Sequence, residues 1–218
     1  MSSVLSSEPV GDALREIGER EDARYWQRVQ AREAELGLAL GAADRAPFAV
    51  EAPLAISSRV GEVLHALVLA TRPSLVVEFG ASLGISTIYL ASALADLGTG
   101  RVVTTELVAQ KAERTAAVLE RAGLGEYVEV LVGNALQTLR GIDAPVGLLF
   151  LDGANDLYLA VLELLRPRLA STAIVAADMS YEDKNHEAYR AYVNDGNNGL
   201  LSTEVALDAG LVISTPAR

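Results

Sequence analysis

Short apolar runs alternate with segments of helical character through the middle of the chain, and this alternation constrains the fold more than any other feature. The apolar runs that we predict to be strands lie at residues 75–79, 101–105, 128–132, 147–151 and 172–177. The intervening segments, predicted to be helices, lie at residues 85–97, 108–122, 135–140 and 156–169. Strands that are apolar on both faces and separated by helices are typical of a parallel sheet covered on both sides.

The C-terminal part follows a different pattern. Residues 181–193 are predicted to be helical, and residues 200–206 and 211–215 are predicted strands joined around the turn "DAG". A hairpin beside five βα units would extend the parallel sheet with strands of mixed direction. We therefore predict an α/β fold with a doubly wound, seven-stranded mixed sheet.

The N-terminal part is charged and favours helix. Leu14, Ile17, Tyr25 and Val29 recur at roughly helical spacing, which predicts one or two amphipathic helices. Residues 41–53 contain two prolines and are predicted to form a loop, and a further helix is expected before Pro73. We therefore predict two parts: an N-terminal helical extension at residues 1–55 and a ligand-binding domain at residues 56–218.

Composition excludes several classes of partner. The chain has 18 Lys and Arg against 29 Asp and Glu, a net charge of -11, and no basic run, so nucleic acid is not expected to bind. It has no cysteine, which excludes disulfides and thiolate metal sites. No uncharged apolar run reaches the ~20 residues that cross a bilayer, and no basic leader is visible, so we expect a cytoplasmic protein without a membrane partner. Arginine far exceeds lysine (only Lys111 and Lys184), which favours a bacterial source.

The stretch "VVEFGASLGIS" places an acid and two glycines at the end of the first predicted strand. Ligands of open α/β sheets bind beyond the carboxyl ends of the strands. Gly80 would allow a sharp turn, and Gly84 would allow a ligand or a helix to approach closely. The spacing lacks the middle glycine of the dinucleotide fingerprint, and both Ser82 and Glu78 would disfavour a pyrophosphate. A ligand with a cationic amine fits this acid better.

The next two predicted strands also end in polar residues. Glu106 ends "VVTTE", where an acid can accept hydrogen bonds from both hydroxyls of an adenosine ribose. Asn134 follows the third strand and could bond an adenine edge, with Ala135 beneath the ring. Taken singly, the glycines could be ordinary turns and Glu106 a solvated strand end. Their occurrence at three successive strand ends favours a nucleoside site.

Four segments together, "VVEFGASLGIS", "TTE", "GNAL" and "LLFLDGANDLYL", resemble class I S-adenosylmethionine-dependent methyltransferases of the catechol O-methyltransferase-like small-molecule branch. The resemblance runs from about Ile56 to the C-terminus and implies a Rossmann-like sheet whose last strand is antiparallel. It implies that S-adenosylmethionine is the cofactor and that Asp152 lies near its methionine end. The residues that we predict to bind the cofactor are Glu78, Gly80, Ser82, Gly84, Ser86, Glu106, Gly133, Asn134, Ala135 and Asp152.

The resemblance also implies a metal site at which this chain departs from the family. Related proteins bind a divalent ion such as magnesium through acids matching Asp152 and Asp178 and through a following asparagine, where this chain has Met179. A thioether is a poor ligand for a hard ion. Two carboxylates and water could still hold a metal weakly at Asp152 and Asp178, or Asp178 could cap its loop.

A second departure concerns the general base. The family places a lysine three residues after the first acid, and this chain has Asn155, whose amide cannot accept a proton. His186 is the leading candidate base, although a histidine beside Glu187 could be a surface residue. Tyr181 and Lys184 are weaker candidates, and His65 is expected in the core or on a helix surface. The predicted catalytic residues are thus Asp152 and His186.

The leading prediction is an S-adenosylmethionine-dependent O-methyltransferase (EC 2.1.1.-) that acts on a phenolic or catechol-like metabolite. The resemblance further implies a homodimer whose N-terminal helices shape the interface and the acceptor site; Tyr25 and Trp26 could stack on an acceptor or a partner, or pack in a helix core. The alternatives are a protein that binds the cofactor but catalyses another reaction, and a non-catalytic partner. A nicotinamide-dependent oxidoreductase is disfavoured by Glu78 and the missing glycine.

Overall fold

The computed structural model describes residues 3–18, 24–50, 52, 54–179 and 186–217. Its α-helices are α1 (Glu8–Gly18), α2 (Arg24–Leu36), α3 (Ala42–Ala49), α4 (Ser58–Thr71), α5 (Ile85–Leu97), α6 (Ala109–Arg121), α7 (Ala135–Thr138), α8 (Tyr158–Leu165) and α9 (Glu187–Asn194). The strands are β1 (Leu75–Phe79), β2 (Arg101–Glu106), β3 (Val128–Val132), β4 (Val146–Leu151), β5 (Leu169–Asp178), β6 (Leu200–Val205) and β7 (Leu211–Pro216).

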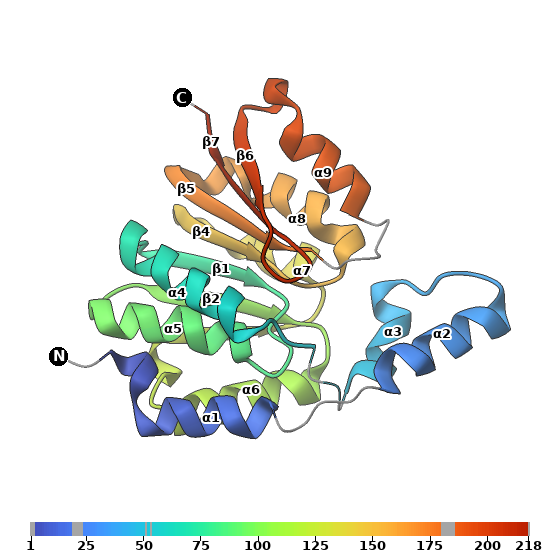
Figure 1. The fold of residues 1–218 in the computed structure, drawn as a ribbon, viewed down its shortest axis with the longest axis horizontal. Helices are drawn as coiled ribbons and strands as arrows, with labels where there is room; N and C mark the ends of the chain where they lie inside the picture. Colours follow the sequence, from blue (N-terminus) through green and yellow to red (C-terminus); the bar gives the residue numbers. More distant parts are fainter. Residues whose placement is uncertain (1–2, 19–23, 51, 53, 180–185, 218) are drawn as a thin grey trace.

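The strands form one seven-stranded sheet in the order β3-β2-β1-β4-β5-β7-β6. β1 to β5 pair in parallel, and β7 pairs antiparallel with both β5 and β6. The predicted Rossmann-like mixed sheet with an antiparallel last strand is confirmed. Because β1 lies between β2 and β4, the ends of these three strands are neighbours at one edge of the sheet (Figure 1).

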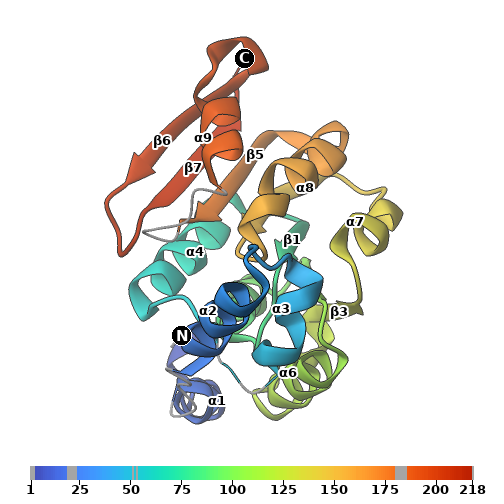
Figure 2. The same ribbon diagram turned by 90° about the vertical axis from the view of Figure 1, so that its right-hand side faces the viewer.

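Helices cover the sheet on both faces, as the doubly apolar strands predict. α1, α4, α5 and α6 contribute to the hydrophobic core on one face, and α7, α8 and α9 contribute to the core on the other (Figures 1 and 2). β1 is buried along its whole length. Its apolar side chains therefore alternate between the two cores, with Val76 in one and Val77 in the other.

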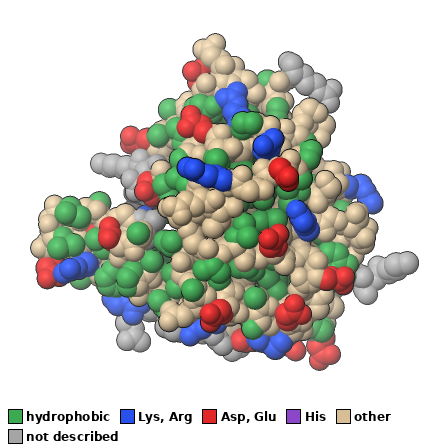
Figure 3. All heavy atoms as spheres, turned by 180° about the vertical axis from the view of Figure 1, so that it is seen from behind, with side chains coloured by type: hydrophobic (Ala, Val, Ile, Leu, Met, Phe, Trp, Pro, Cys, Tyr) green, Lys and Arg blue, Asp and Glu red, His purple; other side chains and the backbone are tan. Residues whose placement is uncertain are grey.

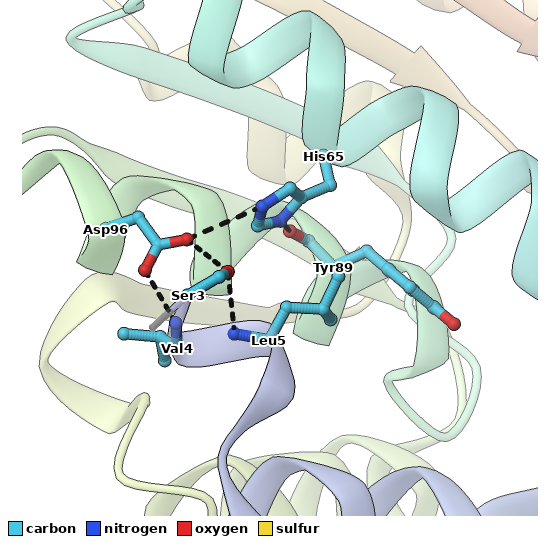
Figure 4. A network of polar contacts seen from close by, with 6 residues as sticks. All are labelled: Ser3, Val4, Leu5, His65, Tyr89 and Asp96. Carbon is cyan, nitrogen blue, oxygen red and sulfur yellow. Dashed lines mark hydrogen bonds and ion pairs between the residues drawn. The ribbon is translucent and has the colours of Figure 1, made fainter. Parts of the chain in front are cut away.

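Hydrogen bonds connect the N-terminal residues Ser3 and Val4 to α5, as part of a polar network that also includes α4 (Figure 4). Asp96, in the last turn of α5, accepts hydrogen bonds from the Ser3 hydroxyl at 2.5 Å and from the Val4 N–H at 2.6 Å. His65 of α4 lies between the Tyr89 carbonyl oxygen, 3.1 Å from Nδ1, and Asp96 Oδ2, 3.5 Å from Nε2. The prediction of a core or helix-surface histidine thus holds, because His65 is buried and its ring connects α4 to α5.

α2 and α3 form a pair of helices that stands beyond the carboxyl ends of the parallel strands (Figures 1 and 2). The pair has its own small core, which includes Tyr25 and Val29 from α2 and Ala49 from α3. Arg45 of α3 forms an ion pair of 3.6 Å with Asp156, which follows β4. Tyr25 is therefore a helix-core residue, whereas the side chain of Trp26 lies outside the described part of the chain.

The predicted loop at residues 41–53 is wrong in its first part, since residues 42–49 form α3 with Pro47 inside it. Proline removes a hydrogen-bond donor, but only two residues of the helix follow it, and packing of Phe48 and Ala49 against α2 offsets the loss. The predicted helix at residues 156–169 is interrupted: α8 is flanked by 3₁₀ turns at Asn155–Leu157 and Arg166–Arg168, the latter containing Pro167.

The surface agrees with the acidic composition. On the face seen in Figure 3, the described Lys and Arg side chains are scattered among Asp and Glu and form no continuous basic patch. Among the described residues, no helix is both long enough and apolar enough to cross a membrane.

Candidate functional site

The parallel register brings the acids predicted from the sequence to one edge of the sheet. Phe79 at the end of β1 is paired with Thr105 of β2 on one side and with Leu151 of β4 on the other. Leu151 is in turn paired with Ala177 of β5. Glu106, Asp152 and Asp178 each follow the paired residue on their strand by one position, so their carboxylates emerge at the same level, around the end of β1.

The loop after β1 needs both of its glycines. Gly80 has a φ of +99°, and a Cβ at this position would lie 2.6 Å from the carbonyl oxygen of Asp152. Gly84 has a φ of +94°, and its Cβ would lie 2.9 Å from Thr115 Cγ2 of α6. Of the two partners that the sequence allowed for Gly84, the structure places a helix there. The glycines therefore let the ends of β1 and β4 and the side of α6 meet closely.

Glu78 is fully buried at the end of β1. The Thr87 hydroxyl donates to Glu78 Oε2 at 2.5 Å, whereas Oε1 has no hydrogen-bond partner among the described residues. Burial raises the pKa of the Glu78 carboxyl, and the hydroxyls of Ser86, Thr104 and Thr87 oppose that rise. The Ser86 and Thr104 hydroxyls lie close enough to affect this pKa without reaching Oε1 in hydrogen-bond geometry. A buried carboxylate oxygen without a donor is suited to a ligand that brings one.

Glu106 holds two loops together at the end of β2. Its Oε2 accepts from the Ser82 N–H at 2.9 Å and its Oε1 from the Val108 N–H at 2.8 Å. Burial raises the pKa of Glu106, and these two amides together with the Lys111 charge oppose the rise. Because a carboxylate has about four lone-pair sites, these two amides do not exhaust its capacity to accept hydrogen bonds.

Ser82 and Ser86 lie in and just after the glycine loop. Ser82 has a φ of +50°, and its hydroxyl accepts from the Leu54 N–H at 3.1 Å. The Ser82 carbonyl oxygen accepts from the Thr115 hydroxyl at 2.9 Å. Ser86 is buried in the first turn of α5. The loop is thus fixed between residue 54 on one side and α6 on the other.

The end of β3 provides the third group of predicted residues. Gly133 has a φ of +124° and donates its N–H to the Glu106 carbonyl oxygen at 2.9 Å. Asn134 caps α7 by accepting from the Leu136 N–H at 2.9 Å, which occupies its Oδ1 and leaves its amide NH₂ to donate. Ala135 is buried next to it.

Asp152 and Asp178, at the ends of neighbouring strands, both have raised pKa values. Burial raises the pKa of Asp152 well above its ordinary value, and repulsion from Asp178 and Glu78 adds to the rise. Burial and repulsion from Asp208 raise the pKa of Asp178 to about 6. The sequence did not single out Asp208, which lies in the β6–β7 turn and is hydrogen-bonded to Ser57, the N-cap of α4.

The residues present do not complete the metal site that the resemblance implied. Met179 is fully buried in the core beneath α8 and α9, and its N–H donates to the Gly210 carbonyl oxygen at 2.9 Å. No group of three His, Cys, Asp or Glu side chains in the described ranges is arranged to hold a metal ion. Met179 replaces the family's asparagine, and its thioether is a poor ligand for a hard ion, so the residues present do not fit this metal.

His186 is buried, with 2% of its surface exposed, so the alternative of a surface residue is wrong. Its ring centroid lies 5.2 Å from that of Tyr158, and the Tyr158 hydroxyl donates to the Asp178 carbonyl oxygen at 2.9 Å. Packing at the start of α9 thus places His186 near the end of β5. Asn155 begins the 3₁₀ turn that precedes α8, and Tyr181 and Lys184 lie outside the described residues.

Lys111 is the other residue of this region that the sequence did not single out. It lies in the first turn of α6 and is 2% exposed, and the charges of Glu106 and Asp152 act on it. Its only sequence signal was the rarity of lysine in this chain.

Comparisons with known proteins find similar sequences and folds among methyltransferases. The family model described as "Methyltransferase domain" matches residues 77–179. The chain is 36% identical over 142 residues to the catechol O-methyltransferase of Mycobacterium tuberculosis, covering 64% of each chain, which is just under two thirds of that relative's length. Cofactor-bound Rv0187 from MTB is 26% identical, with 96% of this chain and 97% of that one covered and a TM-score of 0.69. TomG, an O-methyltransferase from Streptomyces achromogenes solved in complex with SAM, has the same fold at 24% identity, with 91% of each chain covered and a TM-score of 0.67.

Proposed function

We propose that this chain is a class I S-adenosylmethionine-dependent methyltransferase, which transfers the methyl group of S-adenosylmethionine to an oxygen of a small molecule of the phenolic or catechol-like class. One observation supports this most: carboxylates lie at the neighbouring ends of β1, β2 and β4, and a buried oxygen of Glu78 has no hydrogen-bond donor among the described residues. The cofactor's ammonium, sulfonium and ribose hydroxyls supply such donors and charges.

We assign the cofactor's parts to the three strand ends. Glu106 would accept hydrogen bonds from the two ribose hydroxyls with its remaining lone pairs. Glu78 and Asp152 would face the amino-acid end, where the ammonium can pair with them. Gly133, Asn134 and Ala135 would border the adenine. Ser82 and Ser86, with Gly80 and Gly84, would shape the loop around the amino-acid end.

S-adenosylmethionine supplies an already activated methyl group, so the chain's task is to align the acceptor oxygen with it and to exclude water. His186 would take the acceptor's proton, since its buried ring lies near the end of β5. The ring packs there against Tyr158, whose hydroxyl donates to the Asp178 carbonyl oxygen. Asp152 would orient the acceptor from the neighbouring strand. Asn155 cannot act as a base, which is why we place the proton on His186.

The N-terminal extension at residues 1–55 would take part in acceptor binding. The α2–α3 pair stands beyond the strand ends and is tied to the loop after β4 by the Arg45–Asp156 ion pair. We propose that this pair of helices borders the acceptor site and contributes to a homodimer. Sedimentation of Arg45→Ala and of the unaltered protein at several concentrations would test whether the chain forms a homodimer to which these helices contribute.

The experiment for the proposed reaction is a methyl-transfer assay with labelled S-adenosylmethionine and a panel of phenols and catechols. We expect a labelled ether product with at least one acceptor, and a lower kcat for His186→Asn while its affinity for S-adenosylhomocysteine stays unchanged. Absence of any methylated product from a protein that binds the cofactor would contradict the proposal. Unchanged kcat in His186→Asn would contradict the assignment of the base alone.

A further inference from the structure

Lys111 is a buried residue to which the proposed reaction assigns no role. It is 2% exposed, although lysine is almost never fully buried unless its charge is paired. It lies on the same face of α6 as Thr115, one turn further along. Thr115 donates to the Ser82 carbonyl oxygen at 2.9 Å and fills the space beside Gly84. The Lys111 side chain is therefore on the side of α6 that faces the glycine loop.

The charges that act on Lys111 come from two of the acids at the strand ends. Glu106 and Asp152 are the two carboxylates whose charges act on it, and they stabilise its charged form against the effect of burial. Glu106 is the last residue of β2 and Asp152 follows β4, and these two strands flank β1 in the sheet. A cation that interacts with both acids stands near the end of β1, where the amino-acid end of the cofactor would lie.

We propose that Lys111 is an internal counter-ion of the cofactor pocket that sets the preference between the positively charged methyl donor and its demethylated product. The inference rests on the proposed function, because it takes S-adenosylmethionine as the donor. The donor and the product differ by one methyl group and one charge: the donor sulfur is a cation and the product sulfur is neutral. A fixed ammonium nearby weakens binding of the donor more than binding of the product.

This role explains how one pocket can hold several acids. Glu78, Glu106 and Asp152 would together attract the sulfonium strongly and would repel one another when the pocket is empty. Lys111 offsets part of that charge in the free protein. It therefore limits the preference for the donor, and acts through the field of the pocket rather than by contact with the transferred methyl group.

The test is titration calorimetry of S-adenosylmethionine and S-adenosylhomocysteine against the whole chain and its variants Lys111→Met and Lys111→Arg. We expect Lys111→Met to raise the ratio of donor affinity to product affinity about fivefold. Lys111→Arg, which keeps the charge, should restore the ratio of the unaltered protein. Arg121→Met is the matched control, because it removes an exposed charge from the far end of the same helix and should leave the ratio unchanged.

Several results would overturn the inference. An equal loss of affinity for both ligands in Lys111→Met would assign Lys111 to a purely structural role or to the cofactor's carboxylate, which both ligands share. A ratio of donor affinity to product affinity that is unchanged or lower in Lys111→Met would also contradict it. If Lys111→Met does not fold, as judged by circular dichroism, Lys111→Gln takes its place with the same expected ratio. Failure of the unaltered protein to bind either ligand would instead contradict the proposed function.

Discussion

At the scale of single residues, the site concentrates charge in a place where charge is costly to bury. Glu78, Glu106 and Asp152 all have raised pKa values, and burial is the first cause in each case. A structure that only had to be stable would place apolar side chains here. The acids are therefore expected to lower the stability of the free protein and to recover that loss when a cation binds.

Glu78→Gln tests this expectation. The raised pKa means that the folded protein holds this proton more tightly than the unfolded chain does. The Glu78 contribution to stability is thus fully present below about pH 4.3 and is lost as pH rises through the folded-state value. Glutamine removes the charge, so we expect roughly 1–3 kcal/mol more stability at pH 7.5 and little change at pH 4. Melting temperature against pH, without cofactor, is the measurement; equal curves for both proteins would argue against a buried charge.

Gly80→Ala tests the close approach of β1 and β4. The added Cβ would lie 2.6 Å from the Asp152 carbonyl oxygen at a positive φ. We expect a loss of roughly 2–4 kcal/mol in urea denaturation, together with weaker cofactor binding. Gly141→Ala is the control, because a Cβ added there would have no described atom within 4 Å apart from its chain neighbours. A Gly80→Ala protein as stable as this control would show that the loop can shift.

The sequence indicated these residues to different degrees. Glu78 and Glu106 could be found because each lies at the end of an apolar strand, and the strand ends of a parallel sheet share an edge. Lys111 and Asp208 could not, since their proximity to the site depends on which face of α6 is turned inward and on where the C-terminal hairpin folds back. His186 was found as a candidate, but its burial depends on packing against Tyr158, which no local pattern encodes.

At the scale of secondary structure, the best-predicted elements have glycine boundaries. α5 spans Ile85–Leu97 as predicted, because Gly84 precedes it and Gly98, with a φ of +66°, ends it by donating to the carbonyl oxygens of Ala95 and Leu94. The prediction at α3 was wrong because local proline and glycine signals were outweighed by packing against α2. Contacts with a distant segment cannot be read from local sequence.

The contact between the N-terminal turn and α5 gives a prediction at this scale. Asp96→Asn keeps the size of the side chain but weakens its hydrogen bonds to Ser3 and Val4. We expect faster amide hydrogen exchange in residues 4–17, by about fivefold for a loss of about 1 kcal/mol, with the rest of the chain unaffected. Asp143→Asn serves as the control, since Asp143 is exposed and far along the chain from this network. Equal exchange in the two variants would show that apolar packing of α1 alone holds the segment.

At the scale of the whole molecule, the sheet order explains how distant residues form one site. Residues from β1, β2 and β4 are separated by up to about a third of the chain, and they meet because β2 and β4 lie on either side of β1. The alternation of apolar runs and helices was enough to predict the class of fold, because strands of this kind have few other arrangements. The acceptor's identity was not predictable, since acceptor pockets are built from variable loops and helices rather than from the sheet.

The central claim is that the acids at these strand ends bind the cofactor, and titration calorimetry of the pure protein with S-adenosylhomocysteine tests it most directly. The account predicts one site per chain and an affinity that falls at least about tenfold in Glu106→Ala, because hydrogen bonds from both ribose hydroxyls to a charged group are lost. No binding to the unaltered protein, or equal affinity in Glu106→Ala, would contradict it.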